Sequence, residues 1–220
     1  MNPTAPKTRP PAARRKGFTL IELLTVIMII VILMGILMPT IQGVRRAGYA
    51  AKCRTLLGVL ESGIQTYYSD HAQYPGQINP GIIGGGDNQM TGSQVLAQGM
   101  FTDKNDVNNF PVEGYAPLNA DVLAEINGKP NTIADQFPRP MGLCYYVSRP
   151  GQSGLGQFVY ADNNLHTNGK TGPTSFSDFI KDRRFKGDSS TTPYRDGEYL
   201  LIAPGPDRKY FTSDDVKNWN

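Results

Sequence analysis

The stretch GFTLIELLTVIMIIVILMGILMPTI, residues 17–41, decides the fold of this chain. It is almost continuous hydrocarbon and contains one charged residue, Glu22. The 24 residues from 18 to 41 would form a helix roughly 36 Å long at ~1.5 Å per residue, which exceeds the ~30 Å hydrocarbon core of a bilayer. The stretch therefore predicts a helix that spans a membrane once.

A basic leader precedes this span. Residues 1–17 contain no acidic residue, and their basic residues are Lys7, Arg9, Arg14, Arg15 and Lys16. The whole chain has 22 basic and 19 acidic residues, a net charge of +3, so the part after the leader is slightly acidic. The basic balance is therefore no argument for a nucleic-acid partner, and we predict none. Basic residues directly before an apolar span predict a cytoplasmic N-terminus, with the remainder on the far side.

Two simpler roles for the apolar stretch have to be weighed. A secretory signal peptide has a shorter apolar region that ends in a small-residue cleavage site, and no such site follows Ile41. A plain one-span anchor fits the length of the stretch. In that case Glu22 would lie near enough to the membrane surface for its carboxylate to reach water.

The residues around the start of the span carry a family resemblance. Lys16-Gly17-Phe18-Thr19-Leu20-Ile21-Glu22 resembles the processing site of type IV pilins and type II secretion pseudopilins. The resemblance implies that a prepilin peptidase cuts between Gly17 and Phe18, removes residues 1–17 and N-methylates Phe18. Glu22 and Pro39 stand where these proteins usually carry a glutamate and a proline.

The resemblance also gives Glu22 a physical role. After cleavage Phe18 carries a free, positively charged amine, and a charged group inside an apolar segment is costly unless it is paired. We predict that Glu22 of one subunit pairs with the Phe18 amine of a neighbour. Such head-to-tail contacts generate open filaments, so Glu22 would set the axial register of assembly.

The helix is expected to continue beyond the span, through residues 42–72. An apolar stripe recurs there at three- and four-residue steps and predicts packing on the chain's own sheet: Val44, Ala47, Ala51, Leu56, Val59, Leu60, Ile64 and Tyr67. A separate coiled-coil partner is the alternative. Pro39 lacks a backbone donor, so we expect a kink or local unwinding over residues 35–43.

The end of this helix carries a second resemblance, to major pseudopilins. In those proteins a series of residues marks the entry into the globular domain, and the matching positions here are Leu60-Glu61, Tyr67 or Tyr68, Asp70 and Tyr74-Pro75. The pattern implies that residues 73–220 form a loop-rich globular domain.

The order of elements predicts an α+β, pilin-like fold in which the long helix packs on a small antiparallel sheet. Short helices are expected at residues 92–101 and 119–128, and strands at residues 143–148, 156–161 and 198–203. The chain has two histidines and no G-x-S-x-G, H-E-x-x-H or P-loop motif, so we do not predict an enzyme.

Two cysteines, Cys53 and Cys144, are too few for a multi-bridge framework or a zinc site. Cys53 lies among apolar neighbours of a predicted helix, which favours a buried thiol. A Cys53–Cys144 bridge is the alternative in an oxidising compartment.

The segment APGPDRKYFTSDDVKNW, residues 203–219, is rich in the oxygen ligands that calcium prefers. The candidate ligands are Asp207, Thr212, Ser213, Asp214 and Asp215. The segment resembles the calcium loop of type II secretion major pseudopilins, which implies a calcium site. Arg208 and Phe211 replace two glycines of that loop. We expect the replacements to oppose the φ > 0 turn and to place a positive charge beside the ion, so a solvated turn is the alternative.

Together these features predict a structural subunit, a pseudopilin. It would sit in the bacterial inner membrane with its globular domain in the periplasm, and then polymerise into a filament of a type II secretion-like system. Its expected partners are further copies, other pseudopilins, the inner-membrane assembly platform and the prepilin peptidase. The alternatives are a type IV pilus pilin for adhesion, motility or DNA uptake, and an anchored binding module that never polymerises.

Overall fold

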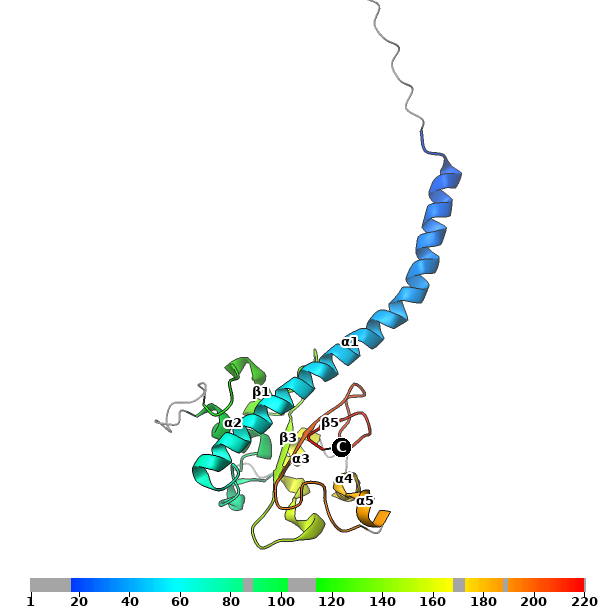
Figure 1. Ribbon diagram of the computed structural model, residues 1–220. Coiled ribbons are helices and arrows are strands. Elements are labelled where there is room, and N and C mark those ends of the chain that lie inside the picture. The colour runs from blue at the N-terminus through cyan, green and yellow to red at the C-terminus, as the bar shows by residue number, and fades with distance from the viewer. Residues whose placement is uncertain (1–16, 85–88, 103–113, 168–172, 188–189, 220) are drawn as a thin grey trace, which may run out of the picture. The chain divides into compact units, whose positions relative to one another are not determined.

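The computed structural model describes residues 17–84, 89–102, 114–167, 173–187 and 190–219 (Figure 1). The chain divides into two compact units, with the boundary between Val44 and Arg45. The long helix α1, Leu20–His71, contributes to both units. The expected α+β architecture is confirmed, because this long helix is followed by small antiparallel sheets.

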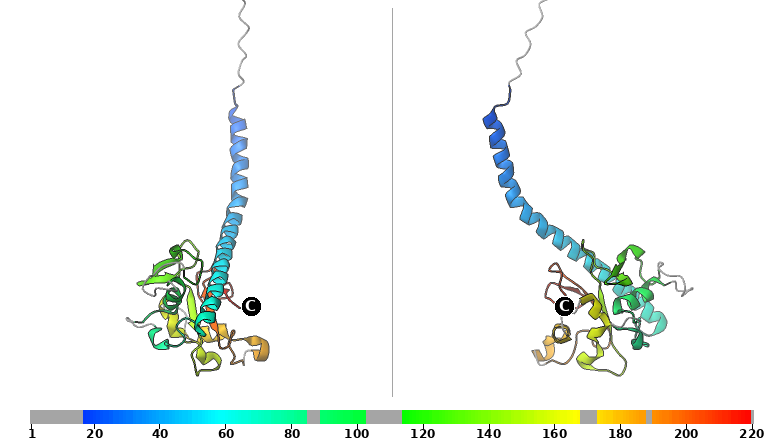
Figure 2. Two further views of the ribbon diagram at one scale, coloured as in Figure 1. Left: turned by 60° about the vertical axis from the view of Figure 1, so that its left-hand side comes forward. Right: turned by 180° about the vertical axis from the view of Figure 1, so that it is seen from behind.

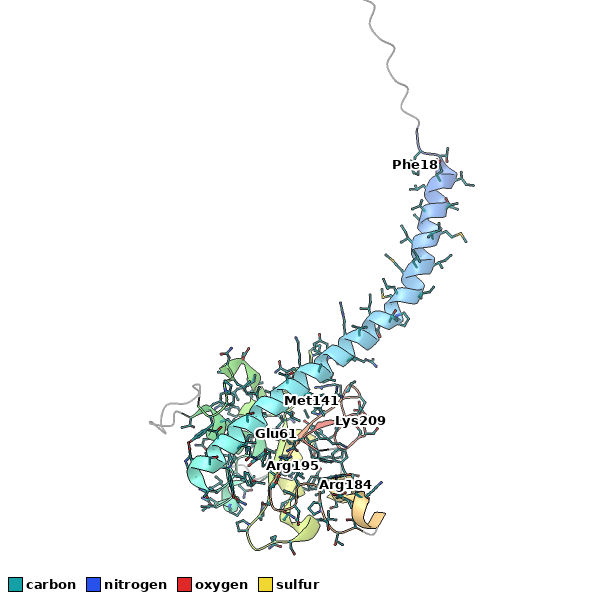
Figure 3. All side chains as sticks on the ribbon, in the orientation of Figure 1. Phe18, Glu61, Met141, Arg184, Arg195 and Lys209 are labelled. Carbon is teal, nitrogen blue, oxygen red and sulfur yellow. The ribbon has the colours of Figure 1, made fainter. Side chains whose placement is uncertain are left out.

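In the first unit, the described residues 17–44 are exposed throughout, including their large apolar side chains. Figure 3 shows these side chains projecting from α1, with Phe18 at its start. Within the described part of the chain, α1 is the one helix that is long and apolar enough to cross a membrane. An apolar helix of this length with no burial against its own chain requires another apolar environment.

The helix passes through Pro39 without interruption, so the expected local unwinding does not occur. The hydroxyl of Thr40, the next residue, donates to the carbonyl oxygens of Ile36 at 3.1 Å and Leu37 at 2.9 Å. Such back-bonding satisfies carbonyls near the missing proline donor and often bends helices. The kink itself stays a prediction.

In the second unit, α1 packs through one face, but the stripe predicted from the sequence is partly wrong. Ala47 and Ala51 are exposed, as is Val44 at the end of the first unit. The buried residues of α1 begin at Ala50 and are Ala50, Cys53, Leu56, Leu57, Leu60, Gly63 and Ile64. The three- and four-residue steps were read correctly, but the early part of the face was assigned to the wrong residues because small apolar residues occur on both sides of the helix there.

A three-stranded antiparallel sheet forms the centre of this unit. It consists of β3 (Cys144–Val147), β4 (Tyr199–Ala203) and β5 (Val216–Lys217), in the order β3-β4-β5. Every residue of β3 and β4 is buried, because both faces of the sheet are covered. The strands expected at residues 143–148 and 198–203 are therefore confirmed.

Alternation along the strands sends side chains into two separate clusters. Tyr145 and Tyr199 face the cluster that contains the buried face of α1. Tyr146 and Leu200 face a second cluster. That second cluster also holds residues of α4 (Pro173–Ile180) and of the C-terminal segment: Phe176, Ile180, Tyr210 and Trp219.

Helix α2, Gly92–Phe101, has the expected bounds. Thr91 caps it: its side chain accepts from the backbone N–H of Gln94, and the Gln94 side chain accepts from the backbone N–H of Thr91. This reciprocal arrangement is a capping box, which satisfies two donors at the helix start.

The helix expected at residues 119–128 is wrong. A 3₁₀ turn at Ala120–Val122 leads into β1 (Leu123–Ile126), which pairs antiparallel with β2 (Lys129–Ile133). The connecting residues Asn127 and Gly128 both have positive φ, 52° and 74°. This is the conformation that Asn-Gly favours in two-residue hairpins, so the dipeptide could have revealed the hairpin.

The strand expected at residues 156–161 is also wrong, since 3₁₀ helices occupy Gly154–Gln157 and Tyr160–Asn163. The remaining described elements are short: η1 (Pro80–Ile82), α3 (Asn164–Thr167) and α5 (Arg183–Lys186). Within the second unit, α2 and the β1–β2 hairpin lie toward one side, and β5, α4 and α5 toward the other (Figures 1 and 2).

Candidate functional site: the helix start and the C-terminal loop

The predicted cleavage point lies just outside α1. Gly17 and Phe18 are exposed and non-helical, and helix α1 begins two residues later at Leu20. Phe18 is 79% exposed. A peptidase needs an accessible peptide that is not locked into helical hydrogen bonds, and the Gly17–Phe18 bond meets that requirement. The leader prediction, apart from Gly17, lies outside the described residues.

Glu22 has a local partner that the sequence prediction missed. Its Oε2 accepts from the backbone N–H of Thr19 at 2.9 Å and from the Thr19 hydroxyl at 2.7 Å, while the backbone N–H of Glu22 donates to that hydroxyl at 3.3 Å. These contacts form a capping box, and the T-x-x-E spacing was the signal for it. The pairing of Glu22 with a neighbour's Phe18 amine stays a prediction, and it would compete with this cap.

The C-terminal loop brings together four of the five predicted calcium ligands, three carboxylates and one hydroxyl. Carboxylate oxygens of Asp207, Asp214 and Asp215 lie within 4.8 Å of one another. The hydroxyl of Thr212 donates to Asp214 Oδ1 at 2.6 Å and to Asp215 Oδ1 at 3.2 Å. Ser213 is exposed on the same loop.

Backbone amides of the loop hold these carboxylates in place. Asp215 Oδ2 accepts from the N–H of Phe211 at 2.7 Å, and Oδ1 accepts from the N–H of Gly205 at 3.2 Å. The N–H of Asp207 donates to Asp214 Oδ2 at 3.0 Å. A Cβ on Gly205 would collide with the backbone of Asp214, so this close approach requires glycine.

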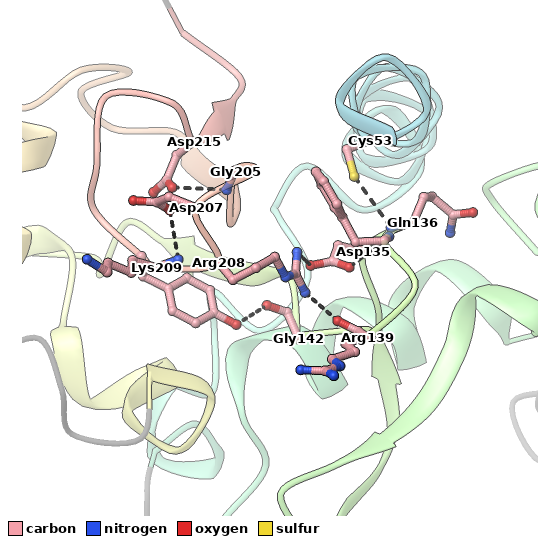
Figure 4. A network of polar contacts seen from close by, with 12 residues as sticks. Cys53, Asp135, Gln136, Arg139, Gly142, Gly205, Asp207, Arg208, Lys209 and Asp215 are labelled. Atoms are coloured by element: carbon pink, nitrogen blue, oxygen red, sulfur yellow. Dashed lines mark hydrogen bonds and ion pairs between the residues drawn. The ribbon is translucent and has the colours of Figure 1, made fainter. Parts of the chain in front are cut away.

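Two sequence expectations about this loop are wrong. Arg208 and Phe211 were expected to oppose a φ > 0 turn, yet both adopt it, with φ values of 60° and 64°. Arg208 was also expected to bring its charge beside the ion. Its guanidinium instead forms an ion pair with Asp135 at 2.7 Å, and Figure 4 shows it directed away from Asp207 and Asp215.

The environment of the three carboxylates differs. Burial raises the pKa of Asp215 to about 7, against the lowering effect of its hydrogen bonds from Phe211, Gly205 and Thr212. At Asp214 burial acts in the same upward direction, but the hydrogen bonds from Thr212 and Asp207 outweigh it and the pKa is lowered. Asp207 and Asp214 are exposed and Asp215 is buried.

The donor set fits a hard divalent cation. Calcium takes oxygen ligands from carboxylates, hydroxyls and carbonyls, and the loop offers three carboxylates and the Thr212 hydroxyl. Three carboxylates this close repel one another when ionised, and a divalent cation would relieve that repulsion.

The two cysteines are free and buried in separate clusters, so the alternative of a Cys53–Cys144 bridge does not occur. Burial raises the pKa of both thiols. Cys53 Sγ also accepts from the backbone N–H of Gln136 at 3.4 Å.

Glu61 of the helix-end pattern and Asn218 of the C-terminal segment meet in space. Glu61 of α1 forms an ion pair with Arg195 at 3.3 Å and accepts from Asn218 Nδ2 at 3.4 Å. Arg195 Nη1 donates to the backbone oxygen of Asn218 at 3.2 Å, and Figure 3 labels both Glu61 and Arg195. Sequence reasoning missed Arg195, because no local pattern marks it.

His166 has no predicted catalytic role and is buried. Its Nε2 lies 3.0 Å from the Thr91 hydroxyl, and burial, helped by the charge of Lys129, lowers its pKa to about 4. Because the unfolded chain would bind a proton at a pKa near 6.5, the folded state loses stability as the pH falls from 6.5 toward 4. This contribution is fully present above pH 6.5.

We therefore expect His166→Gln to reduce the loss of unfolding free energy that residues 45–220 show as the pH falls below 6.5. This fragment contains every described buried residue, since burial begins at Ala50. Between pH 7.5 and 5.0 the wild type should lose about 2 kcal/mol relative to the variant in urea unfolding. Asp162, whose pKa burial raises to about 6, acts in the opposite direction in both proteins and cancels in the comparison. If the unfolding free energy of the wild type and the variant fell equally between pH 7.5 and 5.0, the role of His166 would be contradicted.

Comparison with known proteins identifies one segment. The prokaryotic N-terminal methylation motif matches residues 12–38, a range that contains Gly17, Phe18 and Glu22. No curated protein and no solved structure matches the chain. The motif and the exposed apolar helix together indicate a single-pass, membrane-anchored protein. The chain thus carries the prepilin-type cleavage and methylation signal of type IV pilin-like proteins.

Proposed function

We propose that this chain is a pseudopilin. It is inserted in the bacterial inner membrane with its N-terminus in the cytoplasm and residues 45–220 in the periplasm. After cleavage it polymerises into a short periplasmic filament of a type II secretion-like system. The observation that carries the proposal is the methylation motif at residues 12–38, together with the exposure of every apolar side chain in the described residues 17–44.

The apolar helix serves two environments in succession. In the precursor, lipid covers residues 18–41. In the filament, helices of neighbouring copies replace the lipid, and the other pseudopilins and the inner-membrane platform guide each subunit into place. Glu22 then exchanges its local cap for the Phe18 amine of a neighbour, since an unpaired charge in an apolar core is costly.

Two other functions share the processing signal. A type IV pilus pilin would build an extended surface filament, and the candidate calcium loop, with no cysteine pair near the C-terminus, favours the pseudopilin. A membrane-anchored binding module that never polymerises would leave Gly17–Phe18 uncut and Glu22 dispensable.

The processing step is tested by the mass of the purified protein. We expect the mature chain to begin at Phe18 and to carry one added methyl group. Gly17→Val should block cleavage, because a side chain at Gly17 prevents close approach of the peptidase to the backbone. Gly35→Val, at a helical glycine with open space around it, serves as the matched control and should be cut normally. An uncut wild-type chain would favour the anchored binding module.

We also propose that the C-terminal loop binds calcium. The ion would be held by Asp207, Thr212, Asp214 and Asp215. Its positive charge would offset the repulsion among the three carboxylates. The loop's own amides would keep these oxygens oriented before the ion arrives.

The calcium proposal predicts a rise in the melting temperature of residues 45–220. One millimolar calcium should raise it by about 3 °C or more, as expected for a dissociation constant near ~10⁻⁴ M. Asp214→Asn should remove most of that rise, and Asp178→Asn, an exposed carboxylate outside the loop, should not. An unchanged melting temperature at millimolar calcium would remove the claim.

A further inference from the structure

The left-handed backbone at Arg208 needs a structural explanation. Arg208 (φ 60°) and Phe211 (φ 64°) stand three residues apart in a conformation that disfavours residues with a Cβ. Such a conformation persists where the surroundings hold it. The contacts of the Arg208 side chain show what holds it.

Arg208 is bound from three directions by one segment, residues 135–139, which follows β2. Its Nη1 lies 2.7 Å from Asp135 Oδ2, and its Nη2 donates to the backbone oxygen of Arg139. The centre of the guanidinium lies 4.6 Å from the ring centroid of Phe137. The Asp135 side chain is fully buried, while that of Arg208 is 25% exposed. A buried carboxylate that lost its partner would strongly destabilise the fold. The ion pair therefore keeps the loop against residues 135–139.

A second contact fastens the same loop two residues further on. The hydroxyl of Tyr210 donates to the backbone oxygen of Gly142 at 2.7 Å. Both contacts reach the connection between β2 and β3, so residues 205–215 are attached to the body of the unit on one side. Figure 4 shows Arg208 beside Asp135 and Arg139, with Gly142 close by.

The segment that receives Arg208 also contacts α1, where its packing begins. The N–H of Gln136 donates to Cys53 Sγ, and the Phe137 ring lies 5.5 Å from the ring of Tyr49. A continuous set of contacts therefore runs from the loop through Asp135–Phe137 to the first packed turns of α1.

We propose that Arg208 acts as a latch: its guanidinium is a fixed internal cation that holds residues 205–215 in their turned conformation. Through Asp135–Phe137 it also connects these residues to α1. The role requires no metal ion. Because the guanidinium orders the loop, the carboxylates of Asp207, Asp214 and Asp215 stay aligned when no ion is bound. This role does not depend on whether the loop binds calcium. Arg208 is a positioning residue, and its effect passes through Asp135.

The test is hydrogen–deuterium exchange, read by mass spectrometry, of the full chain in detergent with EDTA present. In the wild type, amides of residues 205–215 should be protected, because Gly205, Asp207, Phe211 and Thr212 donate to loop carboxylates. Arg208→Met and Asp135→Asn should each speed their exchange about tenfold or more. Lys209→Ala, which removes the adjacent exposed charge, is the matched control and should change exchange less than about twofold.

Two controls separate a local effect on the loop from unfolding of the whole unit. Peptides from β4 and the packed part of α1 report whether a variant still folds. If Arg208→Met exposes them too, Arg208→Lys, which keeps the charge but not the planar fork, should fold and show intermediate loop protection. Unchanged loop protection in the folded Arg208 variants, or equal loss in Lys209→Ala, would overturn the latch. Adding calcium tests the metal proposal separately, since a missing calcium effect leaves the EDTA comparison unaltered.

Discussion

Glu22→Ala is expected to abolish filament formation while leaving the cut between Gly17 and Phe18 intact. The scissile bond lies outside the helix and does not involve the glutamate side chain, so processing should continue. Assembly would leave each Phe18 amine without a partner in an apolar core, which is costly. We expect filaments released by opening the outer membrane and collected by sedimentation to fall at least about tenfold, with the cleaved subunit retained in the membrane fraction.

Two companion variants separate pairing from capping. Glu22→Gln keeps an oxygen for the cap at Thr19 but removes the charge, and it should fail in the same way as alanine. Thr19→Ala removes the cap hydroxyl but keeps the carboxylate, and it should still assemble. If Glu22→Ala assembles as well as the wild type, the pairing role is wrong. If Thr19→Ala fails as severely, the loss of the cap explains the effect.

Gly92→Ala should destabilise the globular unit by about 3 kcal/mol or more, the largest effect we expect from one methyl group. Gly92 begins α2 and lies against β3. A Cβ there would collide with the backbone carbonyl oxygen of Tyr145 and lie 2.8 Å from the side-chain nitrogen of Asn163. The carbonyl belongs to a fully buried strand, which cannot move aside without disturbing its pairing with β4. Urea unfolding of residues 45–220 measures the loss.

Gly58→Ala is the matched control for this glycine. Gly58 lies on the exposed side of α1 with open space around it. Alanine is the better helix former, so the change should stabilise the fragment by about 0.5–1 kcal/mol. A Gly92→Ala fragment as stable as the wild type would mean that α2 and β3 are less closely packed than the structure has them.

Features encoded in consecutive residues were predictable. The apolar run specified the first part of α1, and the helix expected at residues 92–101 has the bounds of α2. The buried strands β3 and β4 stood out as short runs of aromatic and branched residues between turn residues. Prediction failed at residues 119–128, where Gly128 belongs to the Asn-Gly turn of a hairpin and does not end a helix.

Only part of the candidate calcium loop could be predicted from neighbouring residues. The acidic residues could be recognised from their spacing, and three of them do converge. The effect of Arg208 could not, because its partner Asp135 lies 73 residues earlier in the chain. The sequence position of Arg208 predicted a positive charge beside the bound ion, whereas the fold turns that charge toward the buried carboxylate of Asp135.

The sequence by itself determined the processing signal, the membrane-spanning run and the start of the long helix, since each depends on residues within a few positions of one another. The tertiary structure alone decided which face of α1 is buried, which carboxylates converge and where the Arg208 and Arg195 charges are neutralised. The physical reason is that burial and ion pairing depend on distances between residues remote in sequence, and only the packed sheet and helices set those distances.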